Sequence, residues 1–185
     1  MRHLWAPWRM RYILDSIEAR KSEAAGEPGK VSANSGEACF VCEALAQDPL
    51  RDAENQVVWR GPSTVVMLNR YPYNNGHLLV IPKAHRGSLL DFEGAELTEP
   101  VETIKVCMRV LDRMMEPQGY NVGLNQGRVA GAGLPGHLHW HIVPRWLGDV
   151  NFMPTLADTR VIVECLDTFY QRFRVEFEQE LASNS

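Results

Sequence analysis

His137, His139 and His141 occupy every second position of one short segment, and this alternation constrains the fold more than any other feature of the chain. They alternate with bulky apolar residues, namely Leu138, Trp140 and Ile142. Successive side chains of a β-strand point to opposite faces, so the segment predicts a strand with histidines on one face and core residues on the other. One or two strand histidines often form only surface hydrogen bonds, but three in strict alternation favour a functional site.

The composition is typical of a soluble globular protein, because 45% of the 185 residues are hydrophobic and 23% are charged. This length predicts one domain. The net charge of -4 argues against bulk nucleic-acid binding, so any bound anion must be held by a local site. The sequence has neither the ~20 apolar residues of a membrane span nor the apolar segment of a secretory signal. We therefore expect a cytoplasmic protein without a membrane anchor.

Residues 1–36 are expected to form an N-terminal arm and a flexible linker, and residues 37–185 to form the single domain. Residues 22–37 are rich in Gly, Ser, Ala, Asn and Pro without apolar periodicity, as in linkers. The arm before them carries Trp5, Trp8, Arg9 and Arg11. Such residues can stack on bases, but packing on the domain or on a partner subunit is the favoured interpretation.

Apolar and β-branched runs predict the remaining elements. Strands are expected at residues 57–59, 64–68, 77–81 and 120–125, in addition to the histidine segment. Helical spacing of apolar residues predicts an internal helix over residues 97–115 and a C-terminal helix over residues 156–181.

Cys39 and Cys42 form a C-x-x-C pair. In a reducing compartment this spacing indicates metal or redox chemistry rather than a structural disulfide. His85 follows the strand predicted at residues 77–81, where loops carry functional groups on a rigid support.

Four glycines lie within residues 126–136, directly before the histidine segment. Dense glycines let main-chain N–H groups approach an anion, so this loop is interpreted as a phosphate-binding segment, with a plain flexible hairpin loop as the alternative. The loop matches neither the Walker nor the Rossmann glycine pattern.

These features together resemble the histidine-triad (HIT) family of nucleotide hydrolases and transferases. The resemblance rests on Asn69, residues 76–85, residues 125–127 and residues 137–145, and it covers about residues 37–147. The Leu-Trp-Ala-Pro-Trp-Arg start and the residues after Pro144 look like the bacterial subgroup that includes diadenosine tetraphosphate phosphorylases.

The resemblance implies an α+β fold with a five-stranded antiparallel sheet, helices on one side, a long C-terminal helix and pairing into a homodimer. It also implies an enzyme that cleaves dinucleoside polyphosphates at the α-phosphate, with His139 as the nucleophile of a covalent nucleotidyl intermediate. His141 would contact the phosphoryl oxygens or the leaving group. A nucleoside phosphoramidate hydrolase and a nucleotide-binding adaptor are the alternative functions, and retention of His139 favours an enzyme.

By the same resemblance, Asn125 and the main chain at Gly131 and Gly133 would bind the phosphate oxygens. Asn69 and His77 would lie near the nucleoside. Many relatives have Ser or Thr three residues before the first triad histidine. This chain has Leu134 there, which cannot supply a hydroxyl group.

The resemblance further implies a structural zinc site with a tetrahedral Cys2His2 ligand set, formed by Cys39, Cys42, His85 and His137. Two unligated cysteines are the alternative. His137 then has two possible roles, as a metal ligand or as a phosphate contact, and the presence of the other three ligands favours the metal.

Overall fold

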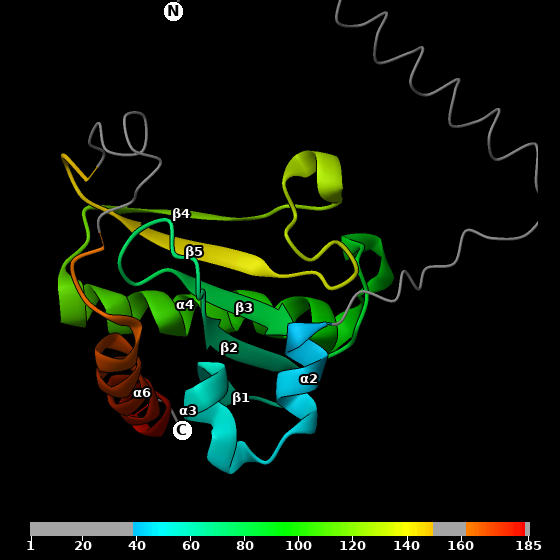
Figure 1. The fold of residues 1–185 in the computed structure, drawn as a ribbon, viewed down its shortest axis with the longest axis horizontal. Coiled ribbons are helices and arrows are strands. Elements are labelled where there is room, and N and C mark those ends of the chain that lie inside the picture. Colours follow the sequence, from blue (N-terminus) through cyan, green and yellow to red (C-terminus); the bar gives the residue numbers. More distant parts are fainter. Residues whose placement is uncertain (1–38, 150–161, 184–185) are drawn as a thin grey trace, which may run out of the picture. The chain divides into compact units, whose positions relative to one another are not determined.

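The computed structural model describes residues 39–149 and 162–183. They contain a five-stranded sheet in the order β1-β2-β3-β5-β4, and every neighbouring pair of strands is antiparallel (Figure 1). The strands are β1 (Val57–Arg60), β2 (Thr64–Leu68), β3 (Leu78–Pro82), β4 (Gly119–Leu124) and β5 (Trp140–Arg145). The α+β fold and the antiparallel five-stranded sheet expected from the sequence are confirmed.

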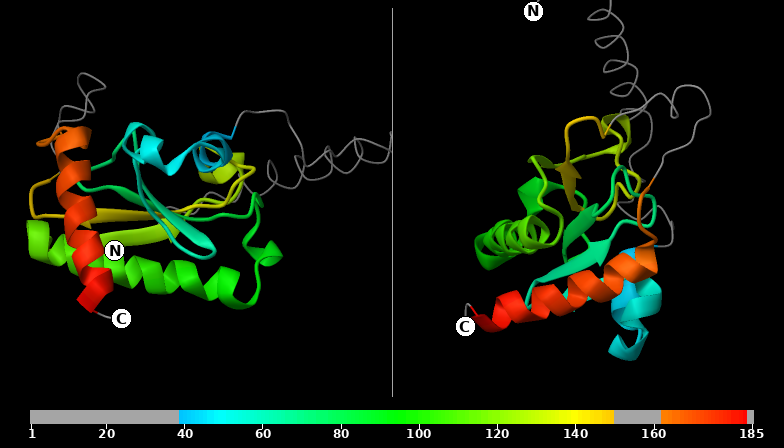
Figure 2. Two further views of the ribbon diagram at one scale, coloured as in Figure 1. Left: turned by 90° about the horizontal axis from the view of Figure 1, so that it is seen from below. Right: turned by 90° about the vertical axis from the view of Figure 1, so that its left-hand side faces the viewer.

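Helices cover both faces of this sheet. The longer ones, α4 (Gly94–Met115) and α6 (Leu166–Ser183), lie on the same side of the sheet (Figure 2). They share one apolar core with β3 and β5. The helix α2 (Phe40–Ala46) packs on the opposite face against β1, β2 and β3. Every residue of β3 is buried because both of its faces are covered, and this explains its continuous apolar sequence.

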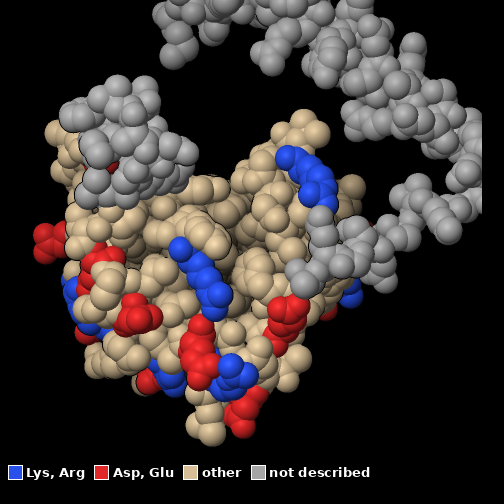
Figure 3. Space-filling view, viewed as in Figure 1, with Lys and Arg blue, Asp and Glu red and all other residues tan. Residues whose placement is uncertain are grey.

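The remaining elements are short. They are α3 (Asp52–Asn55) and three 3-10 turns, η1 (Pro49–Arg51), η2 (Leu89–Asp91) and η3 (Arg128–Ala130). None of the helices within the described ranges is long and apolar enough to cross a membrane. On the side of the molecule shown in Figure 3, acidic and basic side chains are interspersed around α2 and α3.

The histidine segment differs from the prediction at its start, because β5 begins at Trp140 rather than at His137. Pairing with β3 ends at Val80 and Trp140. Pro82 has no N–H group with which to continue the ladder, and its carbonyl oxygen lies 2.7 Å from Nε2 of His137. The chain before β5 is instead held by a hydrogen bond from the Leu138 N–H to the Arg86 carbonyl.

The helices also differ in their bounds. The internal helix starts at Gly94, three residues before the predicted residue 97, whereas its end at Met115 was predicted correctly. The C-terminal helix begins at Leu166, so the prediction is wrong for residues 162–165, and residues 156–161 lie outside the described ranges. Val163 is 83% exposed, and without a packing partner an apolar residue gives a helix little stability.

Helix α2 was not predicted, and it lies on the face that was expected to carry no helix. Its buried residues are Val41 and Ala44, too few to produce a helical period that a sequence pattern can reveal. Residues 1–36 lie outside the described residues, so the division into an arm, a linker and one domain stays a prediction.

Candidate active site

His139 and His141 line a cavity of about 540 Å³ on the α2 side of the sheet. Its floor includes Met67 of β2 and Leu79 of β3, and Leu79 pairs directly with His141 in the sheet. One wall comes from α2, and another from the glycine-rich loop through Gly131. The strand order β2-β3-β5 therefore gathers residues far apart in sequence around the two histidines.

The hydrogen bonds of His139 identify which ring nitrogen carries the proton. Its Nδ1 atom lies 2.8 Å from the carbonyl oxygen of His137. A carbonyl oxygen only accepts hydrogen bonds, so Nδ1 must donate, and the lone pair of the neutral ring is left on Nε2. His139 is 6% exposed, so its ring is held tightly beside the cavity. The geometry therefore leaves Nε2 of a neutral imidazole, in a fixed orientation, without a proton beside the cavity.

A second chain of contacts orients His141. The backbone N–H of Tyr73 donates to Nδ1 of His77 over 3.0 Å, so the proton of the neutral His77 ring lies on Nε2. His77 Nε2 is 2.9 Å from Nδ1 of His141, which therefore accepts this proton. The Nε2–H group of His141 is left as a hydrogen-bond donor at the cavity.

His141 is neutral at physiological pH. Burial and, to a smaller extent, the neighbouring charge of His139 lower its pKa from the ordinary 6.5 to about 4. The ring of Tyr73 stacks on His141 with a centroid separation of 5.9 Å. His141 is thus a hydrogen-bond donor without a positive charge.

Asn69 and His77 were predicted to lie near the nucleoside. In the structure their side chains contact each other, and His77 also contacts His141. The Asn69 amide nitrogen lies 3.3 Å from Nδ1 of His77, and its side-chain oxygen accepts from the Tyr71 N–H. Asn69 lines the cavity, whereas His77 is 2% exposed and contacts His141 and Tyr73 behind it. His77 is therefore placed to position His141 rather than to touch a ligand.

The predicted phosphate-binding residues lie on two sides of His141. Gly131 and Gly133 line the first cavity. Gly131 has φ of 92°, a conformation that other residues rarely adopt. Asn125 lines a second cavity of about 370 Å³, and His141 and Tyr73 line both cavities. Leu134 is part of the first cavity wall, where its side chain offers no hydrogen bond.

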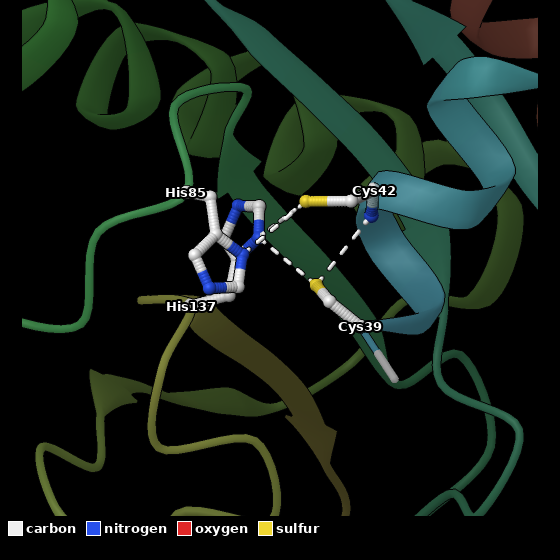
Figure 4. A group of neighbouring side chains, drawn as sticks. All are labelled: Cys39, Cys42, His85 and His137. Carbon is white, nitrogen blue, oxygen red and sulfur yellow. Dashed lines mark hydrogen bonds between the residues drawn. The ribbon is translucent and has the colours of Figure 1, made fainter. Parts of the chain in front are cut away.

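Cys39, Cys42, His85 and His137 point toward one another at the start of α2 (Figure 4). Their ligand atoms all lie within 4.8 Å of one another. The sulfur of Cys39 is 3.3 Å from Nδ1 of His137, and the sulfur of Cys42 is 3.2 Å from Nδ1 of His85. A tetrahedral zinc site with ordinary bond lengths places sulfur and nitrogen ligands about 3.5 Å apart, so these four residues fit a metal.

The ring of His137 is oriented for this role. It is fully buried and lines neither cavity, and its Nε2 donates to the Pro82 carbonyl over 2.7 Å. The lone pair of the neutral ring therefore lies on Nδ1, facing the cysteines, and metal-bound histidines typically donate their other N–H in this way. Burial, followed by the hydrogen bond to Cys39 and the charges of Cys39 and Glu43, raises the pKa of the Cys42 thiol to about 11. A bound cation would favour the thiolate.

Gln47 and Asn55 also line the first cavity, although the sequence did not indicate them as site residues. They lie at the ends of α2 and α3, two short helices that gave no periodic signal. The dipeptide Asp48-Pro49 is a turn signal that marks the boundary between these helices.

The family model described as HIT domain matches residues 51–146. A protein of Mycobacterium tuberculosis named AP-4-A phosphorylase is 35% identical over 90% of this chain and 79% of its own length. An asymmetrical bis(5'-nucleosyl)-tetraphosphatase of Schizosaccharomyces pombe is 32% identical over 52% of this chain and 53% of its own length.

Among solved structures, a Zn-bound histidine triad family protein from Mycobacterium smegmatis has a similar fold, with a TM-score of 0.62. It is 23% identical, and the alignment covers 82% of this chain and all of that one. The fold, the paired histidines at the cavity and the family match agree with one another. This chain belongs to the HIT family.

Proposed function

We propose that the protein cleaves dinucleoside polyphosphates such as diadenosine tetraphosphate at the α-phosphate, through a covalent nucleotidyl intermediate on His139. The observation that carries this proposal is the hydrogen bond from His139 Nδ1 to the His137 carbonyl, which leaves Nε2 as a nucleophile beside the cavity. The two relatives described above, named as a phosphorylase and a tetraphosphatase, support an enzyme for this substrate class.

In the first step, Nε2 of His139 attacks the α-phosphorus, and the bond from that phosphorus to the bridging oxygen breaks. The positive charge that develops on the imidazole is stabilised because Nδ1–H faces the His137 carbonyl. The Nε2–H group of His141 donates to a phosphoryl oxygen or to the departing oxygen. With diadenosine tetraphosphate the products of this step are adenylyl-His139 and ATP.

In the second step, water or orthophosphate attacks the phosphorus and the bond to His139 breaks. Water gives AMP, and orthophosphate gives ADP. The main chain at Gly131 and Gly133 and the amide of Asn125 are the proposed donors to the phosphate oxygens in both steps. Leu134 supplies no hydroxyl group, so donors to the leaving group come from the main chain, from His141 or from solvent.

The two cavities support a substrate with two large ends. They meet at His141 and Tyr73, which line both. A nucleotide in the larger cavity would place its α-phosphate near His139, and the leaving nucleoside polyphosphate would extend toward the cavity that contains Asn125. A phosphoramidate has a single nucleoside end and would leave the second cavity without an occupant.

We further propose that Cys39, Cys42, His85 and His137 hold a structural zinc ion. Four protein ligands leave no open position for substrate, so the metal would fix the chain before β5 rather than take part in the reaction. Reduced cysteines are stable in a reducing compartment, which supports a cytoplasmic location.

A homodimer is also part of this proposal. The strand β4 lies at the edge of the sheet, and Val122 on this strand is 42% exposed. Unpaired edge strands with apolar side chains are surfaces that a second subunit commonly covers. Light scattering at micromolar concentration should give twice the chain mass, and a monomer mass would contradict the dimer.

Incubation with diadenosine tetraphosphate, with and without orthophosphate, tests the enzymatic proposal. A phosphorylase gives ADP and ATP only when phosphate is present, and a hydrolase gives AMP and ATP without it. Binding of the dinucleotide with no products under either condition would favour the adaptor. Cleavage of a nucleoside phosphoramidate but not of the dinucleotide would favour the alternative hydrolase.

A further inference from the structure

Two side-chain amides face each other on the wall of the larger cavity. Gln47 directly follows the last residue of α2, and Asn55 is the last residue of α3. Both line the cavity that contains His139 and His141. Neither amide takes part in the chemistry described above.

The hydrogen bonds determine which amide atom is oxygen and which is nitrogen. One atom of the Asn55 amide lies 3.1 Å from the carbonyl oxygen of Arg51, which only accepts, so that atom is the nitrogen. The same nitrogen lies 3.1 Å from the amide of Gln47, so the facing atom of Gln47 is its oxygen. A single backbone carbonyl therefore fixes the orientation of both side chains.

This network leaves one donor and one acceptor available. The nitrogen of Asn55 is used twice and the oxygen of Gln47 once, so the NH₂ group of Gln47 and the carbonyl oxygen of Asn55 are left. No partner from the described part of the chain is recorded for either group. The cavity thus presents a hydrogen-bond donor beside an acceptor on one wall.

A partly buried ion pair holds these two groups in place. The Arg60 guanidinium donates to both carboxylate oxygens of Asp52 in α3, with a shortest separation of 2.6 Å. It also donates to the carbonyl oxygens of Ala44 and Leu45 at the end of α2. Arg60 therefore connects the two helices that carry Gln47 and Asn55, so their amides are preorganised.

The same cavity also has a lining that suits a planar aromatic group. Apolar side chains of Phe40, Ala44, Met67 and Leu79 line it. Nucleobases combine flat apolar faces with an edge of alternating donors and acceptors. A base packed on these side chains would present its edge to the amide pair.

We propose that Gln47 and Asn55 read the edge of the nucleobase and select adenine over guanine. This inference rests on the nucleotide substrate proposed above and identifies its base. Adenine offers an amino donor at N6 beside a ring-nitrogen acceptor at either N1 or N7, so either of its edges satisfies the pair. Guanine offers two acceptors, O6 and N7, on one edge. Its Watson–Crick edge matches the pair through O6 and N1–H, but then carries an additional amino group that needs an acceptor of its own.

The proposed reading of the base by this amide pair can be tested by replacing its hydrogen-bond donor with an acceptor. In Gln47→Glu, a carboxylate oxygen can still accept from Asn55, but the NH₂ donor is lost. Two adjacent acceptors then face the base, and these match the N1–H and N2–H donors of guanine. Binding of AMP, GMP and purine riboside 5'-monophosphate is measured by titration calorimetry on the full chain, together with Gln179→Glu as a control on the exposed surface of α6.

The unmodified chain and Gln179→Glu should bind AMP about tenfold or more tightly than GMP and than the purine analogue, which lacks the 6-amino group. Gln47→Glu should lower the AMP to GMP affinity ratio at least about tenfold. If the unmodified chain cleaves diadenosine tetraphosphate but the ratio is unchanged in Gln47→Glu, base reading by the amides is wrong and the proposed function stands. If the unmodified chain cleaves diadenosine tetraphosphate but binds AMP no more tightly than GMP, selection of adenine is wrong and the proposed function stands. If it forms no products from the dinucleotide, the proposed function fails, and base reading fails with it.

Discussion

Nε2 of His77 lies 2.9 Å from Nδ1 of His141, and this contact determines which nitrogen of His141 faces the cavity with a proton. Because the Tyr73 N–H already donates to the other nitrogen of His77, the direction of this hydrogen bond is fixed. His77, a buried residue outside the cavity, thereby determines that His141 presents its Nε2–H group to a substrate. The consequence for catalysis is that His77 should act through His141.

Replacement of His77 should separate turnover from binding. His77→Leu removes the donor to His141 and should lower kcat about tenfold or more with a smaller change in KM, because the oriented donor matters most in the transition state. His77→Gln retains an N–H group at a similar distance along the side chain and should recover part of the loss. Steady-state kinetics on both variants measure the difference, and an unchanged kcat in His77→Leu would show that His141 does not depend on this contact.

His139→Ala should abolish turnover while nucleotide affinity stays within about tenfold, equivalent to ~1.4 kcal/mol, because the lost group forms a bond only along the reaction path. Affinity is measured with AMP, and the intermediate is sought by acid quenching and mass spectrometry of the unmodified chain. Undiminished turnover, or an adduct on another residue, would exclude the covalent mechanism proposed for His139.

His141 should make stability depend on pH in a defined window. Its pKa in the folded protein is about 4, below the ordinary 6.5, so the unfolded chain binds this proton more readily. The neutral ring therefore contributes stability that is fully present above about pH 6.5 and is lost as the pH falls toward 4. Its neighbours His77 and His139 are also ionisable, so the pH dependence of stability must be compared with that of a variant in which only His141 is changed.

The matched variant for this measurement is His141→Gln, which keeps a polar side chain but does not titrate. Denaturant unfolding at several pH values between 7 and 4 should show a smaller loss of unfolding free energy in His141→Gln than in the unmodified chain. Equal losses in both proteins would mean that His141 does not contribute to the pH dependence.

Strands were the most predictable part of this fold. The apolar and β-branched runs of β2 and β3 are buried on both faces, so local pattern and tertiary environment agree. The start of β5 was less predictable because it depends on a partner strand: Pro82 on β3 cannot extend the ladder to His137. The start of α6 was also hard to predict. It depends on whether Val163 finds a packing partner, which the sequence alone does not reveal.

Within the candidate site, the sequence indicated residues whose chemistry is unusual in a strand or loop. His139, His141 and the glycines of the loop belong to this group. Gln47 and Asn55 could not be identified in the same way, because exposed amides are common and their meaning here comes from the Arg51 carbonyl that orients them. The hydrogen-bond directions at His77 similarly required the position of the Tyr73 backbone.

If Cys39, Cys42, His85 and His137 hold zinc, the ion connects the start of α2 and the loop after β3 to the residue two positions before His139. Metal binding to ligands that the unfolded chain does not preorganise becomes folding energy. Cys42→Ser should therefore lower the Tm by about 10 °C, the shift that a loss of a few kcal/mol produces in a chain of this size.

Activity of Cys42→Ser should fall as well, because His139 would lose its fixed position. His141→Ala is the contrasting variant, since it should impair turnover while retaining zinc and most of the thermal stability at neutral pH. Elemental analysis should find about one zinc per chain in the unmodified protein. Metal-free protein with unchanged Tm and turnover would remove the zinc proposal, and His137 would then be explained by its hydrogen bond to Pro82 alone.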